Sequence, residues 1–80
     1  MDIESTPDKD FILDDGHRIK TLRELKLLLP KMDPKTFQRH VNENRNDFAN
    51  WTKEVFGAEE VADRMLRTRN SIDLANAIFI

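Results

Sequence analysis

At the centre of the sequence lies HVNENRNDFANW, residues 40–51. This stretch combines a histidine, several asparagines, an aspartate and the only tryptophan of the chain. Buried polar groups need specified hydrogen-bond partners, so polar side chains beside aromatic core candidates indicate a fixed local arrangement. We therefore predict a structural polar junction in this stretch. Its members are His40, Asn44, Asn46, Asp47 and Trp51.

The backbone can form either one continuous helix through this stretch or two helices separated by a break. A single helix from Pro34 to Phe56, turning by about 100° per residue, would align His40, Asp47 and the aromatic side chains on one face. Asparagine and aspartate, however, prefer helix caps and turns to helix interiors. We favour a break, in which Asn46 or Asp47 caps a second helix that ends at Phe56.

His40 and Asp47 form the one combination of histidine and carboxylate that the spacing favours. The two residues share a helix face if the helix continues, and they meet across the corner if it breaks. We interpret them as a clamp between the flanking helices. We expect no enzyme activity, because the sequence shows no nucleophile in a recognisable context. The indole N–H of Trp51 needs an acceptor, for which Asn44 or the His40 region is the candidate.

Length and composition narrow the class of protein. The 80 residues predict one small domain, and they include no cysteine and two histidines. A zinc site needs three or four ligands, and the only two glycines leave no glycine-rich phosphate loop, so we predict neither metal nor cofactor. No apolar run approaches the roughly 20 residues of a membrane span. No secretory signal is visible, and we expect a cytoplasmic protein without a membrane partner.

Upstream of the junction, the chain begins with an acidic segment. Residues 1–9 lack hydrophobic periodicity, so we predict a disordered acidic leader, followed by a single helical domain over residues 10–80. Phe11-Ile12-Leu13, the turn residues Asp14-Asp15-Gly16 and the alternating His17-Arg18-Ile19-Lys20 predict a β-hairpin. An isolated hairpin is marginal in water, so this one must pack on helices.

Helix boundaries are signalled on both sides of the junction. Thr21 and Glu24 form a capping box, and Asp33-Pro34 begins the next helix. Gly57 suits the left-handed position after the helix that ends at Phe56, and another helix is predicted over Glu59–Thr68. Together these signals predict a mainly α fold, a small bundle of four or five short helices with a short N-terminal β-hairpin. The predicted core consists of Phe11, Leu13, Ile19, Leu22, Leu25, Leu29, Phe37, Val41, Phe48, Trp51, Val55, Val61, Met65 and Ile78.

The chain ends on apolar residues. Ser71 can cap a final helix, and we expect its apolar side chains to face the core. These side chains belong to Ile72, Ala75, Ile78 and Phe79. The terminal segment Ile78-Phe79-Ile80 has two interpretations, because apolar termini seldom stay exposed. Either it completes the core or it contacts another chain, for example in a homodimer.

The net charge of −2 is unevenly distributed. Residues 1–15 are acidic, whereas residues 16–80 are mildly basic. Two groups of basic residues are candidates for contacts with nucleic-acid phosphates. They are Arg18, Lys20, Arg23 and Lys26 near the first helix, and Arg64 and Arg67 on the fourth. We expect a non-catalytic protein-interaction module that recognises another protein or itself; the alternative is a nucleic-acid-associated protein that uses these mildly basic helix faces.

The chain resembles a small prokaryotic, mostly archaeal, domain family of unknown function. The resemblance covers residues 11–66 and rests on a set of positions that is specific as an ensemble. These positions are Phe11, Leu13, Asp15-Gly16, Ile19, Leu22, Glu24-Leu25, Met32, Phe37, His40-Val41, Asn46-Asp47-Phe48, Trp51, Val55, Gly57 and Ala62. Ala58 and Thr52 depart from the family pattern, which has an aspartate and an aliphatic residue there. The resemblance implies a compact helical domain and no established activity.

Overall fold

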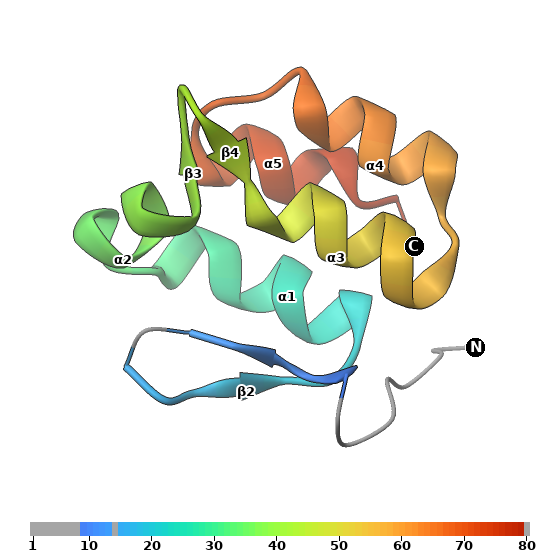
Figure 1. Ribbon diagram of the computed structural model, residues 1–80. Coiled ribbons are helices and arrows are strands. Elements are labelled where there is room, and N and C mark those ends of the chain that lie inside the picture. The colour runs from blue at the N-terminus through green and yellow to red at the C-terminus, as the bar shows by residue number, and fades with distance from the viewer. Residues whose placement is uncertain (1–8, 14, 80) are drawn as a thin grey trace.

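The structure, a computed structural model, describes residues 9–13 and 15–79. The predicted leader therefore lies outside the described residues except for Lys9, as do Asp14 of the hairpin turn and Ile80. The described part contains five α-helices and a short N-terminal β-hairpin (Figure 1). This architecture confirms the predicted fold class.

The N-terminal hairpin pairs β1, Phe11–Ile12, with β2, Arg18–Ile19. Phe11 lies opposite Ile19 in the antiparallel register. In the connecting turn Gly16 has a φ of 92°, in the left-handed region that glycine adopts without steric cost. The Asp-Gly turn signal therefore predicted this hairpin correctly.

Helix α1 spans Leu22–Leu28 and begins at the predicted capping box. The amide of Glu24 donates to the hydroxyl of Thr21 at 3.0 Å, and the carboxylate of Glu24 accepts from the amide of Lys20 at 2.9 Å. The return bond thus reaches one residue before the cap. A 3₁₀ turn over Leu29–Lys31 follows, because its proline has no amide hydrogen with which to continue the α-helix.

The backbone breaks between the second and third helices, as favoured from the sequence. Helix α2, Pro34–His40, is followed by two very short strands, β3 over Val41–Asn42 and β4 over Arg45–Asn46, which form a second antiparallel hairpin. Helix α3 then spans Asp47–Phe56. The hairpin itself was not predicted, since its turn contains no glycine. Its turn is held by the side chain of Asn42, whose Oδ1 accepts from the amide of Asn44 at 2.9 Å.

Two further helices complete the chain. Helix α3 ends at Gly57, which has a φ of 65°, and α4 spans Glu59–Leu66. Helix α5 spans Ser71–Ala77. The cap of α5 is Asn70 rather than the predicted Ser71: its Oδ1 accepts from the amide of Asp73 at 2.8 Å. Both residues are good caps, and the chain uses the first.

The core is one cluster to which the hairpin β1–β2, all five helices and the 3₁₀ turn contribute. The predicted core is largely confirmed, although four of its members are only partly buried: Phe11, Leu22, Val55 and Val61. Of the four residues expected to face the core at the end of the chain, Ala75 and Ile78 are buried, whereas Ile72 and Phe79 are exposed. The expectation for Phe79 was wrong because α5 ends at Ala77, before Phe79 can continue the helical stripe, and the expectation for Ile72 was wrong because Leu74, Ala75 and Ala77 form the buried face of α5.

Figure 1 shows the arrangement that places the corner between α2 and α3. Helix α1 lies between hairpin β1–β2 and the other helices, and α3 runs beside α4. Hairpin β3–β4 projects next to the connection from α4 to α5. Within the described ranges, no helix has the length and apolar character needed to cross a membrane.

Candidate binding cleft at the asparagine-rich corner

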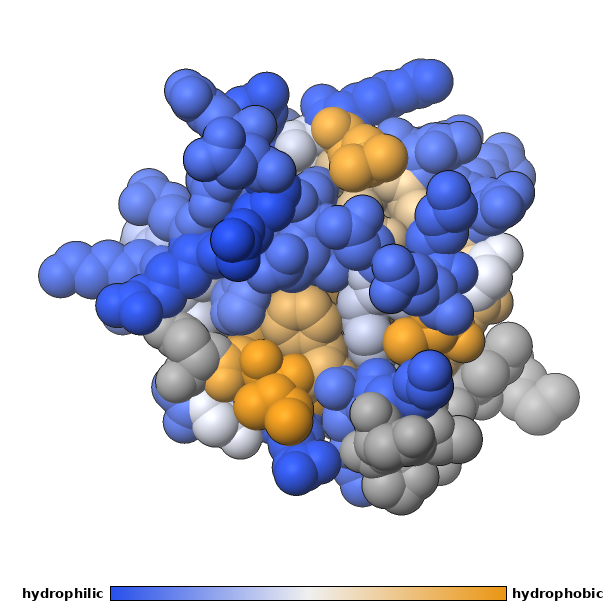
Figure 2. Space-filling view, viewed as in Figure 1, coloured by the Kyte–Doolittle hydropathy of each residue, from blue (hydrophilic) through white to orange (hydrophobic). Residues whose placement is uncertain are grey.

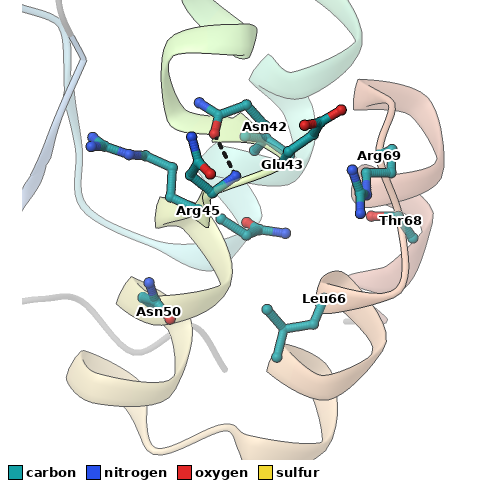
Figure 3. A pocket seen from close by; sticks show the side chains of 10 residues that line it. Asn42, Glu43, Arg45, Asn50, Leu66, Thr68 and Arg69 are labelled. Atoms are coloured by element: carbon teal, nitrogen blue, oxygen red, sulfur yellow. Dashed lines mark hydrogen bonds between the residues drawn. The ribbon is translucent and has the colours of Figure 1, made fainter.

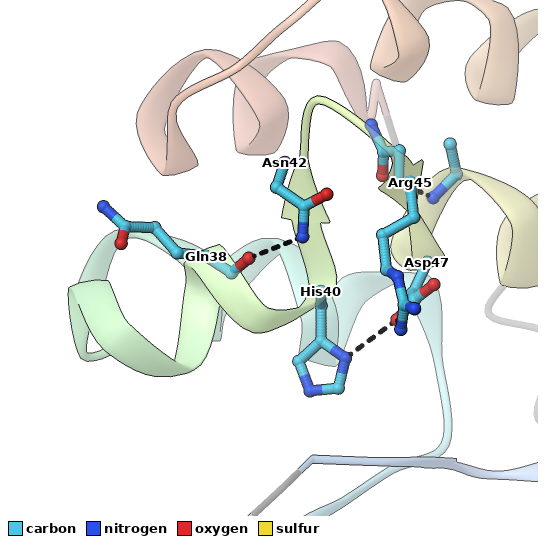
Figure 4. Close-up of polar contacts among 7 residues, drawn as sticks. Gln38, His40, Asn42, Arg45 and Asp47 are labelled. Carbon is cyan, nitrogen blue, oxygen red and sulfur yellow. Dashed lines mark hydrogen bonds and ion pairs between the residues drawn. The ribbon is translucent and has the colours of Figure 1, made fainter.

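The contact predicted between His40 and Asp47 is present. His40 is the last residue of α2 and Asp47 is the first of α3, and Nδ1 of the imidazole lies 3.1 Å from Oδ2 of the carboxylate (Figure 4). A carboxylate accepts hydrogen bonds, so Nδ1 carries the proton in this contact. The interaction joins two helices across the intervening hairpin, which is what a structural clamp requires.

Aromatic rings enclose the His40 imidazole. The ring of Phe11 meets it edge-on with centroids 5.1 Å apart, and the ring of Phe48 lies 5.5 Å away. The side chain of His40 is 14% exposed, and its Nε2 is buried without a hydrogen-bond partner among the described residues. An imidazole in this setting packs as a ring among aromatic side chains. The geometry therefore favours packing and positioning over acid–base chemistry.

Asn46 connects the corner to the far end of α4. Its Oδ1 accepts from the amide of Ala49 at 3.0 Å, and its Nδ2 donates to the carbonyl of Met65 at 3.1 Å. The side chain is buried, and both halves of its carboxamide are bonded. One residue therefore caps α3 and holds that helix against the end of α4.

Trp51 and Asn44 have different partners from the expected ones. The indole Nε1 of Trp51 donates to the carbonyl of Lys9 at 2.7 Å, so the expected acceptor at Asn44 or the His40 region was wrong. The reason is geometric: the indole packs edge-on against Phe11 and Phe56, on the side where the chain enters the domain. Asn44 is exposed in the turn of hairpin β3–β4 and contributes no side-chain bond to the junction among the described residues.

The outer side of the corner forms an open polar cavity of about 310 Å³, which we call the corner cleft. One wall is hairpin β3–β4 with the first turns of α3, and the other is the end of α4 with the start of the connection to α5 (Figure 3). The cleft is lined by Val41, Asn42, Glu43, Asn44, Arg45, Asn46, Asn50, Leu66, Thr68 and Arg69. Its volume is at the lower end of the range for ligand sites, roughly 300–1,000 Å³.

The polar groups of the corner cleft fall into two sets. Asn42 is used within the fold, because its Nδ2 donates to the carbonyl of Gln38 at 3.0 Å and its Oδ1 holds the turn. Asn46 is likewise fully bonded. In contrast, four polar side chains have no hydrogen-bond or ion-pair partner within residues 9–13 and 15–79. These are the side chains of Glu43, Asn44, Asn50 and Arg69.

The basic residues predicted to contact phosphates do not share one surface. Arg18 lies on β2, whereas Arg64 lies on α4 and Arg67 is the residue that follows this helix. Figure 1 shows β2 and α4 on opposite sides of the molecule. The ammonium of Lys26 is engaged inside the fold, where Nζ donates to the carbonyls of Ala75 at 2.9 Å and Ile78 at 2.6 Å.

Other predicted basic residues also have neighbours of their own. Arg18 pairs with the buried carboxylate of Asp10 at 3.6 Å, and the guanidinium of Arg64 lies 4.7 Å from the centre of the Phe79 ring. Lys20 and Arg23 lie at the start of α1, near Arg18 in sequence but away from α4. A continuous basic face is therefore not formed by these residues.

Of the residues that line the corner cleft with free side chains, the sequence assigned only Asn44 to the junction; it did not assign Glu43, Asn50, Leu66 or Arg69 to this site. The amide-rich run over residues 40–51 marked one wall. No local signal could mark Leu66 or Arg69, because packing of α4 on α3 brings them to the corner.

The cleft offers polar groups that can bind a ligand. Its lining offers amides, a carboxylate, guanidinium groups and a hydroxyl, and it contains no histidine or cysteine. Among the residues that the structure describes, no three acidic, histidine or cysteine side chains gather as a metal site. No family model, curated protein or solved structure matches this chain. The resemblance to a domain family of unknown function stays a prediction.

Proposed function

We propose that this chain is a non-catalytic interaction module that binds a segment of another polypeptide in the corner cleft. The observation that carries the proposal is the set of unbonded polar side chains around an exposed leucine. Glu43 and Asn44 stand on the hairpin wall, and Asn50, Leu66 and Arg69 come from the helices and the connection opposite or below it.

A polypeptide backbone suits these side chains. Each peptide unit presents one donor and one acceptor, and the carboxamide of asparagine can pair with both. Asn44 and Asn50 have such carboxamides free of partners in the described part of the chain. Leu66 is 55% exposed at the cleft and offers apolar surface to a ligand side chain. Interfaces of this composition, mixed polar and apolar, are typical of protein recognition.

Hydropathy over the surface agrees with a polar recognition site. Figure 2 shows hydrophilic side chains over the region of α2 and hairpin β3–β4, while apolar side chains lie in separate small areas on that face. A large continuous apolar patch, the usual mark of an obligate interface, is not visible there. Recognition through a polar cleft with one exposed leucine fits this surface better.

Nucleic-acid binding has less support. Proteins that bind single strands stack bases on aromatic side chains, and no residue lining the corner cleft is aromatic. The cleft also combines a carboxylate at Glu43 with its arginines, which would oppose a phosphate backbone. Of the terminal segment, Ile78 is fully buried in the core and Phe79 is exposed, so among the described residues only Phe79 offers apolar surface to self-association there.

The proposal can be tested by selecting ligands for the intact chain from a phage-displayed library of random heptapeptides. Selected peptides, made synthetically, should bind at least about tenfold more weakly to Leu66→Ser and to Asn50→Ala, as expected for central contacts. The matched controls are Leu27→Ser and Asn76→Ala, which change exposed residues of α1 and α5.

The controls decide the outcome. If the control variants keep the wild-type affinity while the cleft variants lose it, the proposal holds. It is contradicted if selection yields no peptide ligand, or if the peptides bind all four variants as tightly as the wild type.

A further inference from the structure

We propose that the polypeptide segment bound in the corner cleft carries one acidic and one basic side chain on the same face. This inference rests on the proposed function and names the chemistry of its ligand. It is carried by Glu43 and Arg69, which come from the two facing walls of the cleft and are labelled in Figure 3.

The two charges are available to a ligand. No ion pair within 4.0 Å joins them, and neither has another partner among the described residues. Both side chains are exposed, so water solvates them in the free protein. The free-energy cost of replacing this water by a ligand that also stays near the surface is small. The other arginine of the cleft differs: Arg45 Nη1 lies 3.9 Å from the carboxylate of Asp47, and its side chain points away from the cleft in Figure 3.

Arg69 has the chemistry to bind a carboxylate. Its planar guanidinium donates two parallel hydrogen bonds to such a group. The hydroxyl of its neighbour Thr68 donates to the carbonyl of Met65 at 2.9 Å, which holds this part of the wall in place. Glu43, by contrast, accepts hydrogen bonds only and attracts a lysine or arginine side chain. The two walls of the cleft therefore select opposite charges.

An extended ligand can satisfy both walls at once. In an extended chain, the side chains of residues i and i+2 point to the same face, roughly 6.6 Å apart. An acidic and a basic residue at this spacing would place one charge toward Arg69 and the other toward Glu43. Asn50, which Figure 3 shows on α3 farther along the cleft, is then available to bond the ligand backbone beyond this pair of charges.

Each charge contact can be measured with a double-mutant cycle, in which one substitution is made in the peptide and one in the protein. We would take a heptapeptide selected from the phage library, replace its acidic residue with the amide, and measure its affinity for the full-length wild type and for Arg69→Gln. Loss of one exposed charge contact should weaken binding to the wild type about three- to tenfold. Binding to Arg69→Gln should show no further loss.

The same cycle applies to the basic residue of the peptide and Glu43→Gln. Arg67→Gln and Glu54→Gln are the matched protein controls, because they remove like charges from exposed positions outside the cleft. With these controls, both peptide changes should keep their full wild-type effect. Selected sequences should also contain opposite charges at positions i and i+2.

Three outcomes separate the two proposals. Coupling of the acidic residue to Arg69 and of the basic residue to Glu43 supports the inference. If peptides bind in a manner that depends on Leu66 but tolerate neutralisation of either charge, the inference is overturned while the interaction function stands. If no peptide binds in a Leu66-dependent manner, both proposals are overturned.

Discussion

Nδ2 of Asn46 donates to the carbonyl of Met65 at 3.1 Å, across 19 residues of sequence, while Oδ1 of the same side chain caps α3. The bond joins the start of α3 to the end of α4. Because Asn46 also closes hairpin β3–β4, it fixes one wall of the corner cleft relative to the other. The structural junction and the proposed binding site thus depend on one buried carboxamide.

Asn46→Ala should lower the free energy of unfolding by about 1–3 kcal/mol, because it removes a helix cap and the bond that ties the start of α3 to the Met65 carbonyl. Asn46→Asp keeps the cap acceptor but turns a carboxylate oxygen toward that carbonyl, so it should also destabilise the protein. Urea denaturation at constant m-value measures both, with the exposed Asn76→Ala as control. An Asn46→Ala protein as stable as that control would show that the side chain does not hold the two helices.

The contact between His40 and Asp47 predicts an asymmetry between two substitutions. Asp47→Asn retains an oxygen that accepts from the imidazole and should cost less than about 1 kcal/mol, whereas Asp47→Ala should cost about 1–2 kcal/mol. Asp47 also stands in the first turn of α3, where a negative charge is favourable, so part of the loss in each case is electrostatic. Chemical denaturation distinguishes the two, and ¹⁵N NMR of the imidazole should place the proton on Nδ1. A ring protonated only on Nε2 would contradict the clamp.

Lys26 should contribute to stability through its contacts at the end of α5. Its ammonium donates to the carbonyls of Ala75 and Ile78 at the C-terminal end of α5, where a positive charge is favourable. Lys26→Met retains the aliphatic stem and should destabilise the protein by about 1–3 kcal/mol, with faster amide exchange in α5. Lys53→Met, at an exposed position on α3, is the control. Equal stability of the two variants would refute the contribution of Lys26.

Trp51→Phe tests how Lys9, the first residue that the structure describes, is held against the helices. The substitution keeps an aromatic ring against Phe11 and Phe56 but removes the 2.7 Å bond to the carbonyl of Lys9. We expect a loss of about 1–2 kcal/mol and increased backbone mobility at Lys9, measured by NMR relaxation. Unchanged order at Lys9 would mean that other contacts hold this segment.

Most secondary structure could be predicted because its signals are local. Asp15-Gly16 predicted the first hairpin, the capping box predicted the start of α1, and Asp33-Pro34 predicted the start of α2. The break before α3 followed from the preference of asparagine for caps. Where two adjacent residues are equally good caps, as at Asn70 and Ser71, local signals do not choose between them.

The corner cleft could be predicted only in part, because its second wall depends on contacts distant in sequence. Asn46 meets Met65 across 19 residues, and Lys26 meets Ile78 across 52. Such partners follow from how helices pack, which a single sequence does not reveal. The asparagine-rich run marked the place of the site. No sequence pattern around Arg69, on which the choice of ligand depends in our proposal, indicated that this residue belongs to the site.

The most direct test of the account is an NMR titration of the ¹⁵N-labelled chain with a selected heptapeptide. We predict the largest amide shifts at the corner cleft, over residues 42–46 and 66–69 and at Asn50, with little change in hairpin β1–β2 or α1. Leu66→Ser should abolish these shifts, and Leu27→Ser should leave them intact. Largest shifts over β2 and α1, or shifts that survive Leu66→Ser, would contradict the assignment of the corner cleft as the binding site.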